Sequence, residues 1–344
     1  MEPTAALVWT QYALCVLAIG IAGVKLTDYG DSIADKTGMG GSWVGLVLIA
    51  TVTSLPELAS GITASAVAMV PDIAAGDVFG SCVYNLALLA LLDLFSRREP
   101  VLARVQRQHV MSAGFGILLI SIAGLTLLAA QAGLSGLALH LSWGTPAIVL
   151  IYAVAIRTLH GFREEEVEEF AEREPDRYAG RSLRYIAIRY AAAAVVVVAA
   201  GIALPYVSAD LALVMGWNQS FTGTLFTALS TSLPELVVTL AALRIGAVDM
   251  AAGNVLGSNM FNILVLAVDD LVYTRGSFYA DISAGHLVSA FTAVAMTGLV
   301  VTAIYYRPRK RVLHIGSWAS IALFGLFGLN TWLSFYLGAI DIGH

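Results

Sequence analysis

The chain has 344 residues, of which 58% are hydrophobic and 12% charged. Its mean hydropathy is +0.79, far above that of ordinary water-soluble domains. The net charge is −5, and the basic residues fall in short loops without interleaved aromatic residues, which excludes a continuous surface for nucleic acid. Only two cysteines occur, both inside apolar runs, which excludes a disulfide framework and a four-ligand zinc site.

Ten apolar runs near the length that crosses a bilayer predict an all-α polytopic membrane protein with ten transmembrane helices. The first run follows an acidic residue and precedes a lysine, which is the reverse of the charge order of a signal peptide. We therefore interpret it as the first transmembrane helix. One strongly polar stretch separates the fifth helix from the sixth. In chain order, the predicted helices cover residues 5–25, 42–70, 72–95, 108–131, 142–160, 183–207, 218–244, 248–273, 284–306 and 312–338.

The polar stretch divides the chain into two sets of five helices. We expect residues 1–160 to form a first repeat, residues 161–182 a charged cytoplasmic linker, and residues 183–344 a second repeat. With both termini outside, nearly all Lys and Arg residues fall on the cytoplasmic side, and only Arg275 is left outside. Because five is an odd number, the second set enters the membrane from the opposite side. Any similarity between the two sets is therefore an inverted repeat.

A repeated hexapeptide supplies that similarity, since residues 53–58 and 231–236 both read Thr-Ser-Leu-Pro-Glu-Leu. An ionised carboxylate near the middle of an apolar helix costs roughly 2.5–3.5 kcal/mol, so Glu57 and Glu235 need a function. The preceding prolines, Pro56 and Pro234, lack an N–H and predict a break in each helix. A broken helix in lipid is tolerated only where its backbone oxygens meet protein, water or ions.

A second repeated pattern follows on the next helix of each set. Asp77, Ser81 and Asn85 are spaced by four residues and share one helix face, as do Asn254, Ser258 and Asn262. Carboxylate, hydroxyl, amide and backbone oxygens are the ligands of hard cations such as calcium. Interrupted polar helices in inverted repeats are typical of a transporter's midplane site. We therefore expect all these residues to line one cation site, with Glu57 and Glu235 close together.

In these motifs the chain resembles the sodium/calcium exchanger family, in its prokaryotic form, over the whole membrane domain. The resemblance implies that Glu57 and Glu235 hold calcium with help from backbone oxygens near Thr53 and Thr231. It also implies sodium sites that use Ser54, Ser232, Ser81 and Ser258, and backbone oxygens one turn before each motif, at Ala50 and Ala228. The chain departs from the family at Asp77, where an asparagine is usual, at Cys82 in place of another asparagine, and at Asn262, where an acid is frequent.

The expected function is antiport of calcium against sodium by alternating access, in an integral protein of a prokaryotic plasma (inner) membrane. Calcium/proton exchange is the alternative, because two carboxylates in one cavity repel each other and favour protonation. A cation channel is a more distant alternative. We expect no enzyme activity and no cofactor: the substrates are the ions, and the surroundings are lipid.

Three further ionisable residues, Asp93, Asp270 and His286, lie outside the two motifs. Asp93 and Asp270 occupy equivalent repeat positions near opposite membrane faces, where they are either vestibule acids that attract cations or solvated helix ends. His286, at the outer start of the ninth predicted helix, is a candidate proton relay.

Overall fold

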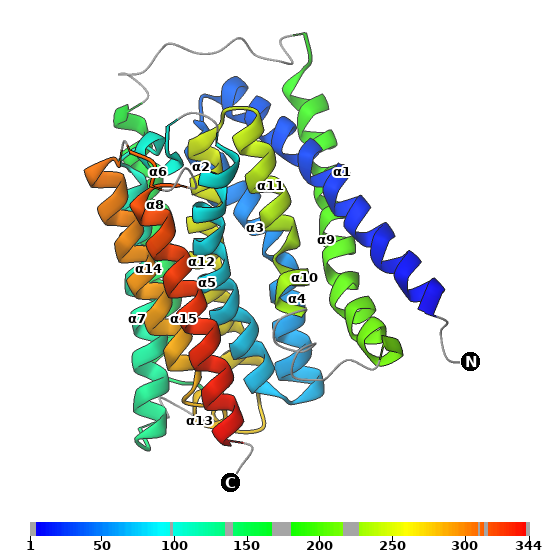
Figure 1. Cartoon of the computed structure of the whole chain (residues 1–344), viewed down its shortest axis with the longest axis vertical. Coiled ribbons are helices and arrows are strands. Elements are labelled where there is room, and N and C mark those ends of the chain that lie inside the picture. Colours follow the sequence, from blue (N-terminus) through cyan, green and yellow to red (C-terminus); the bar gives the residue numbers. More distant parts are fainter. Residues whose placement is uncertain are drawn as a thin grey trace. The chain divides into compact units, whose positions relative to one another are not determined.

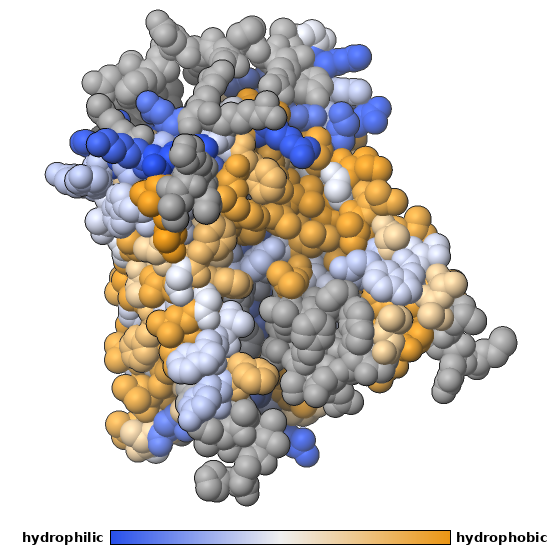
Figure 2. All heavy atoms as spheres, viewed as in Figure 1, coloured by the Kyte–Doolittle hydropathy of each residue, from blue (hydrophilic) through white to orange (hydrophobic). Residues whose placement is uncertain are grey.

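Figure 1 shows the computed structural model, which describes residues 5–96, 99–134, 140–166, 180–215, 227–308, 310–312 and 316–341. These residues are mainly helical, and they form no strand beyond one isolated bridge. Nine of the described helices are long and apolar enough to cross a membrane. Apolar side chains cover much of the face seen in Figure 2, as expected where the solvent is lipid. The predicted class, an all-α polytopic membrane protein, is confirmed.

The helices follow the predicted order, but two run well past their predicted ends: the first continues to Thr37 rather than residue 25, and the sixth to Met215 rather than residue 207. The predicted run 218–244 lies partly outside the described residues, and its described part is α10 (Thr227–Thr231) and α11 (Leu233–Arg244). The count of ten therefore stays a prediction. Most of the charged linker also lies outside the described residues. The other long helices are α1 (Ala5–Thr37), α5 (Pro71–Phe95), α7 (His109–Gln131), α8 (Gly144–Glu166), α9 (Leu183–Met215), α12 (Val248–Val272), α14 (His286–Tyr306) and α15 (Trp318–Asp341).

The second predicted helix is a series of short segments rather than one regular helix. Two of them are wide π-helical turns, which disturb the regular hydrogen-bond ladder and occur frequently at functional sites. In chain order the segments are α2 (Gly41–Trp43), η1 (Val44–Ile49), α3 (Ala50–Thr53), α4 (Leu55–Ile62) and η2 (Thr63–Ala68).

The helix interruptions at the two hexapeptides are smaller than the sequence predicts. Each is a single residue, Ser54 between α3 and α4 and Ser232 between α10 and α11. Helical bonds continue across the first interruption: the Ser54 N–H donates to the Ala50 carbonyl at 3.0 Å, and the Leu58 N–H donates to Ser54 at 3.2 Å. Each proline is the second residue of a new helix, where its missing N–H has no intrahelical partner to lose. The prolines thus start helices instead of opening wide breaks.

The chain forms two compact units, each made of segments from both halves of the sequence. The first unit contains Met1–Ala59 and His160–Asn254, and the second contains Ser60–Leu159 and Val255–His344. In the first unit, α1 packs against α9 and α11. In the second, α14 packs against α7, α5 and α15, and α5 also contacts α15. Short helices α6 (Val101–Arg104) and α13 (Phe278–Asp281) complete the second unit.

Candidate functional site

Glu57 and Glu235 lie in the first turns of α4 and α11, within the first compact unit. Their side chains are 1% and 0% exposed. The N-terminal turn of a helix carries unpaired N–H groups and the positive end of the helix dipole, which favour a carboxylate there. The hexapeptide therefore places each glutamate where a buried negative charge is best tolerated.

The two hexapeptides exchange hydrogen bonds. The Ser54 hydroxyl donates to Oε1 of Glu235 at 3.0 Å, and the Ser232 hydroxyl donates to Oε1 of Glu57 at 3.4 Å. Each serine thus holds the carboxylate of the other motif, although the motifs lie far apart in the sequence. This reciprocal contact joins the two hexapeptides within the first unit. It creates a buried cluster of two carboxylates and two hydroxyls, a ligand set suited to a hard cation.

Asn254, at the start of α12, connects the two motif helices within the same unit. Its Oδ1 accepts a hydrogen bond from the Thr53 hydroxyl at 3.3 Å, and its Nδ2 donates to the Thr239 hydroxyl at 2.9 Å. All three side chains are fully buried. Thr239 is absent from the predicted site, and its position one helical turn after Glu235 on α11 is the only signal that could have indicated it.

Of the backbone oxygens expected to bind ions, that of Ala50 already accepts hydrogen bonds in this conformation. The Ala50 carbonyl accepts hydrogen bonds from the Ser54 N–H at 3.0 Å and from the Thr53 hydroxyl at 3.3 Å. An ion that binds this oxygen competes with these donors. In the second motif, Thr231 is fully buried, and Ala228 lies in the first turn of α10.

A glycine of α9 brings that helix against both motif prolines. A Cβ atom at Gly201 would lie 2.5 Å from Pro56 Cγ and 3.6 Å from Pro234 Cγ. The first of these distances is too short for any real contact, so only glycine fits without a shift. The sequence gives no sign of this role, because Gly201 lies in an otherwise regular apolar helix.

The other predicted site residues belong to the second unit. Ser81, Asn85, Ser258 and Asn262 are all fully buried. Asn259, which the sequence analysis does not select, links α5 to α12: its Nδ2 donates to the Cys82 carbonyl at 3.1 Å, and its Oδ1 accepts from Asn85 Nδ2 at 3.1 Å. Among the described residues, the amide of Asn262 has no hydrogen-bond partner.

Asp93 and Asp270 are neither vestibule acids nor solvated helix ends, because both are fully buried. Asp270 accepts hydrogen bonds from the Ser142 N–H at 2.9 Å and hydroxyl at 3.0 Å, and from the Thr145 hydroxyl, at the start of α8.

Asp93 makes the equivalent contacts with the start of α15. It accepts from the Ser317 N–H at 3.1 Å and from the Ser320 hydroxyl, and it also accepts from the Val101 N–H. Both carboxylates accept hydrogen bonds from N–H groups that the start of a helix leaves unpaired. The sequence spacing alone does not show which helix packs beside each aspartate.

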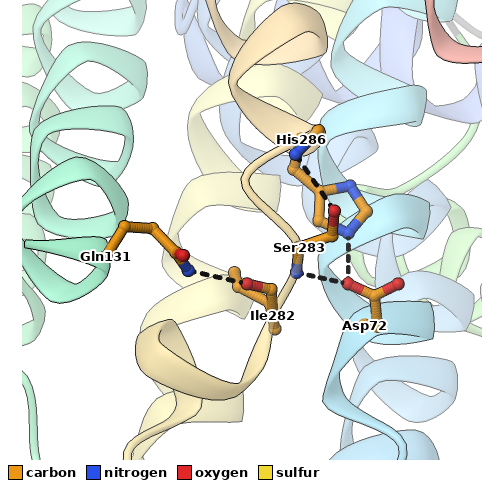
Figure 3. Close-up of polar contacts among 6 residues, drawn as sticks. Asp72, Gln131, Ile282, Ser283 and His286 are labelled. Atoms are coloured by element: carbon orange, nitrogen blue, oxygen red, sulfur yellow. Dashed lines mark hydrogen bonds and ion pairs between the residues drawn. The ribbon is translucent and has the colours of Figure 1, made fainter. Parts of the chain in front are cut away.

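His286 is paired with an acid on another helix, as Figure 3 shows. Its Nε2 lies 2.8 Å from Asp72 Oδ1, and the same oxygen accepts the Ser283 N–H at 2.7 Å. The imidazole also stacks on Phe79, with ring centroids 6.4 Å apart. These contacts fasten the loop before α14 to the first turn of α5, within the second unit. They give His286 a structural role, whereas the predicted proton relay is not tested.

Comparisons with known proteins agree with this architecture. The model of the family described as sodium/calcium exchanger protein matches residues 7–159 and 185–336. The putative antiporter CaxA of Alkalimonas amylolytica is 27% identical over 274 residues, covering 77% of this chain and 81% of that protein. An uncharacterized membrane protein of Methanocaldococcus jannaschii is 25% identical over 326 residues, covering 91% and 97% of the two chains.

A solved structure shares the fold. The sodium-calcium exchanger NCX_Mj, in a crystal soaked with Na+ and Sr2+, superposes with a TM-score of 0.72 at 21% identity, covering 95% of this chain and 98% of that one. The two family-model segments leave out only the chain ends and the central linker. The protein is therefore an integral membrane transporter rather than an enzyme, and it belongs to the sodium/calcium exchanger family.

Proposed function

We propose that this protein is a secondary active antiporter that exchanges calcium for sodium by alternating access. The observation that carries the proposal is the reciprocal contact of Ser54 with Glu235 and of Ser232 with Glu57. Two buried carboxylates together balance the charge of one divalent cation. The serine hydroxyls beside them provide neutral oxygens for a competing monovalent cation.

The ions use overlapping ligands in this proposal, so that calcium and sodium exclude each other. Calcium binds between Glu57 and Glu235, with backbone oxygens near Thr53 and Thr231. Sodium uses the hydroxyls of both motifs, and the polar side chains of α5 and α12 offer further oxygen ligands to the transported ions. The further ligands in this proposal are Ala50, Ala228, Ser54, Ser232, Asp77, Ser81, Ser258, Asn85 and Asn262.

Sodium is favoured over protons as the counter-ion because both motifs keep their Thr-Ser pair. NCX_Mj, which shares the fold, is named as a sodium-calcium exchanger. Calcium/proton exchange is the second candidate, and the observation that favours it is Asn262, an amide at a position where the family frequently has an acid. The proposed location is a prokaryotic plasma (inner) membrane, and the Lys and Arg pattern of the loops favours an orientation with both termini outside.

Ion replacement in proteoliposomes tests the counter-ion. Vesicles loaded with sodium and diluted into sodium-free medium should take up radioactive calcium, and uptake should stop when choline replaces the internal sodium. Uptake driven by a pH gradient in the complete absence of sodium would refute sodium coupling and support proton exchange. Calcium flux that continues without either counter-ion would instead support a channel.

The carboxylates are tested by Glu57→Gln and Glu235→Gln. Each change keeps the shape of the side chain but removes half of the formal charge of the pair, and we expect each to abolish calcium uptake. Asp210→Asn, which neutralises an exposed acid of α9, is the matched control and should transport calcium normally. Purified variants should elute as the wild type does on size exclusion, and near-normal uptake in either glutamine variant would contradict the assignment.

A further inference from the structure

Thr53, the first residue of the first hexapeptide, has two acceptors within reach of its one hydroxyl proton. Its Oγ1 lies 3.3 Å from the Ala50 carbonyl oxygen and 3.3 Å from Oδ1 of Asn254. A hydroxyl group has only one proton to donate, so the two hydrogen bonds compete with each other. All three residues belong to the first unit, and each is at most 1% exposed.

The choice between these acceptors matters for the Ala50 carbonyl, which is a sodium ligand in the proposed function. A carbonyl oxygen has two lone pairs, and the Ser54 N–H already occupies one of them at 3.0 Å. When Thr53 donates to Ala50, the second lone pair is occupied as well. When Thr53 donates to Asn254 instead, the second lone pair is free to bind a cation.

The orientation of the Asn254 amide decides where the Thr53 proton points. In the structure its Oδ1 faces Thr53, and its Nδ2 donates to the Thr239 hydroxyl at 2.9 Å. If the amide turned over, its Nδ2 would donate to Thr53, and the Thr53 proton would turn to Ala50. A buried donor without an acceptor is destabilising. Because Thr239 supplies that acceptor, it holds the amide in the orientation that leaves the Ala50 carbonyl open.

The corresponding positions of the other predicted repeat differ together. Asp77 stands where the second repeat has Asn254, and Gly61 stands where it has Thr239. A carboxylate has no N–H group and needs no acceptor beside it, whereas an amide does. The hydroxyl thus occurs in the repeat whose side chain has an N–H group to satisfy, as expected if Thr239 serves to orient Asn254.

We infer that Thr239 and Asn254 are positioning residues for sodium binding. Together they draw the Thr53 proton away from the Ala50 carbonyl, which leaves this oxygen to the ion. The inference rests on the proposed function, because it takes the Ala50 carbonyl as a ligand of sodium rather than of calcium. Neither side chain has to touch the ion. Loss of either one should therefore weaken sodium binding and leave calcium binding nearly unchanged.

Sodium-driven calcium uptake by the reconstituted protein tests this inference. We expect Thr239→Val to raise the sodium concentration for half-maximal uptake by about five- to tenfold, the effect of one net hydrogen bond. The KM for calcium should stay near that of the wild type. Thr239→Ser, which keeps the hydroxyl, should restore the wild-type sodium dependence. The matched control is Thr297→Val, which removes a buried hydroxyl that donates to the Ala293 carbonyl of its own helix, α14.

A double-mutant cycle separates this orienting role from a general loss of packing. In Thr53→Ala no side-chain proton competes for the Ala50 carbonyl, so the addition of Thr239→Val should change the sodium dependence no further. Additive effects of the two changes would overturn the inference. Asn254→Leu removes the acceptor of the Thr53 proton by a second route, which keeps the test decisive if Thr239→Val does not fold. Unchanged sodium dependence in Asn254→Leu would also overturn the inference.

Binding of sodium alone distinguishes failure of this inference from failure of the proposed function. The unfolding midpoint of the purified protein is measured in detergent without calcium, in sodium chloride and in choline chloride, because a ligand that binds the folded state raises the midpoint. No rise with sodium in the wild type would contradict sodium coupling and this inference together. A rise that is equally large in Thr239→Val would overturn the inference alone.

Discussion

The strongest information at the residue scale comes from the crossed hydrogen bonds of the two hexapeptides. Each glutamate accepts a hydrogen bond from the serine of the other motif. The carboxylates are therefore held in fixed orientations before any cation arrives. Pre-orientation lowers the entropy that binding must overcome, so the serines should affect cation affinity even where they are not ligands.

Removal of these hydroxyls should weaken calcium binding unequally. A hydrogen bond to a charged group contributes about 1.5–3 kcal/mol, and the bond from Ser54 at 3.0 Å is shorter than the bond from Ser232 at 3.4 Å. We expect Ser54→Ala to lower the apparent calcium affinity of sodium-driven uptake by about tenfold or more, and Ser232→Ala to lower it less. Ser54→Thr, which retains the hydroxyl, is the control. Equal affinities in the two alanine variants would show that these bonds do not orient the carboxylates.

Much of the site could be predicted from the sequence because it is carried by identical motifs. Glu57 and Glu235 stand out as acids in apolar helices, and their repetition indicates that they meet. Asn259 and Thr239 do not stand out in this way, because a single amide or hydroxyl in an apolar helix has no distinctive pattern. Their roles depend on the rotation of neighbouring helices, which sequence periodicity does not determine.

At the element scale, two buried aspartates fasten the starts of two helices. Asp93 of α5 holds the start of α15, and Asp270 of α12 holds the start of α8. The pairs are related by the repeat, since α5 and α12 are equivalent helices and so are α8 and α15. Sequence analysis finds the equivalence of the two acids but not their burial, because burial depends on which helix docks beside them.

Neutralising either Asp93 or Asp270, which cap the starts of α15 and α8, should destabilise the protein. In Asp270→Asn, one acceptor oxygen becomes an amide donor that faces the Ser142 N–H and the Thr145 hydroxyl. Buried polar groups then lose their hydrogen-bond partner, which costs about 1–3 kcal/mol of stability. We expect a lower thermal unfolding midpoint in detergent for Asp270→Asn and for Asp93→Asn. The neighbouring change Asp269→Asn removes the same charge but no hydrogen bond to any residue that the structure describes, so its midpoint should be unchanged or higher. A larger loss for Asp269→Asn than for Asp270→Asn would contradict the capping role.

The contact of α9 with the two motif prolines gives a second prediction at this scale. Gly201→Ala places a methyl group within 2.5 Å of Pro56 Cγ, and since the proline ring is rigid, overpacking should cost about 1–3 kcal/mol. We expect a lower unfolding midpoint and slower calcium uptake. The matched control is Gly298→Ala in α14, where nothing lies within 4 Å of the new atom. Because alanine has a higher helix propensity than glycine, this variant should be at least as stable as the wild type. Equal behaviour of the two variants would show that α9 does not need glycine at this contact.

At the scale of the whole molecule, the predicted inverted repeat and the compact units divide the chain differently. The repeat separates the chain near its middle, whereas each compact unit takes segments from both halves. Hydropathy predicts the helices and their order, because each must match the thickness of the bilayer. It does not predict which helices associate, because lipid and protein offer equally apolar surroundings and packing depends on local shape. The π-helical turns of the second helix are missed for a related reason, since they leave hydropathy unchanged.

The last prediction concerns ion selectivity of the whole transporter. Asn262 and Asn85 are equivalent in the repeat, but their amides differ: Asn85 Nδ2 donates to Asn259 Oδ1 at 3.1 Å, while the Asn262 amide has no partner among the described residues. Asn262→Asp therefore adds a charge to a buried position without the loss of a hydrogen bond. Asn85→Asp instead places a carboxylate oxygen against the Asn259 carbonyl oxygen, which is repulsive.

We expect Asn262→Asp to change the sodium dependence or the pH dependence of calcium uptake, and the uncompensated buried charge should also lower the unfolding midpoint when no cation is bound. Asn85→Asp should mainly lower the midpoint, because Asn259 cannot rotate its amide without loss of its bond to the Cys82 carbonyl. Uptake measured over a range of sodium concentrations and of pH values, beside thermal unfolding in detergent, separates the two effects. Unchanged selectivity in Asn262→Asp would show that this face of α12 does not contact the transported ions, because a buried negative charge within reach of a cation must alter its binding.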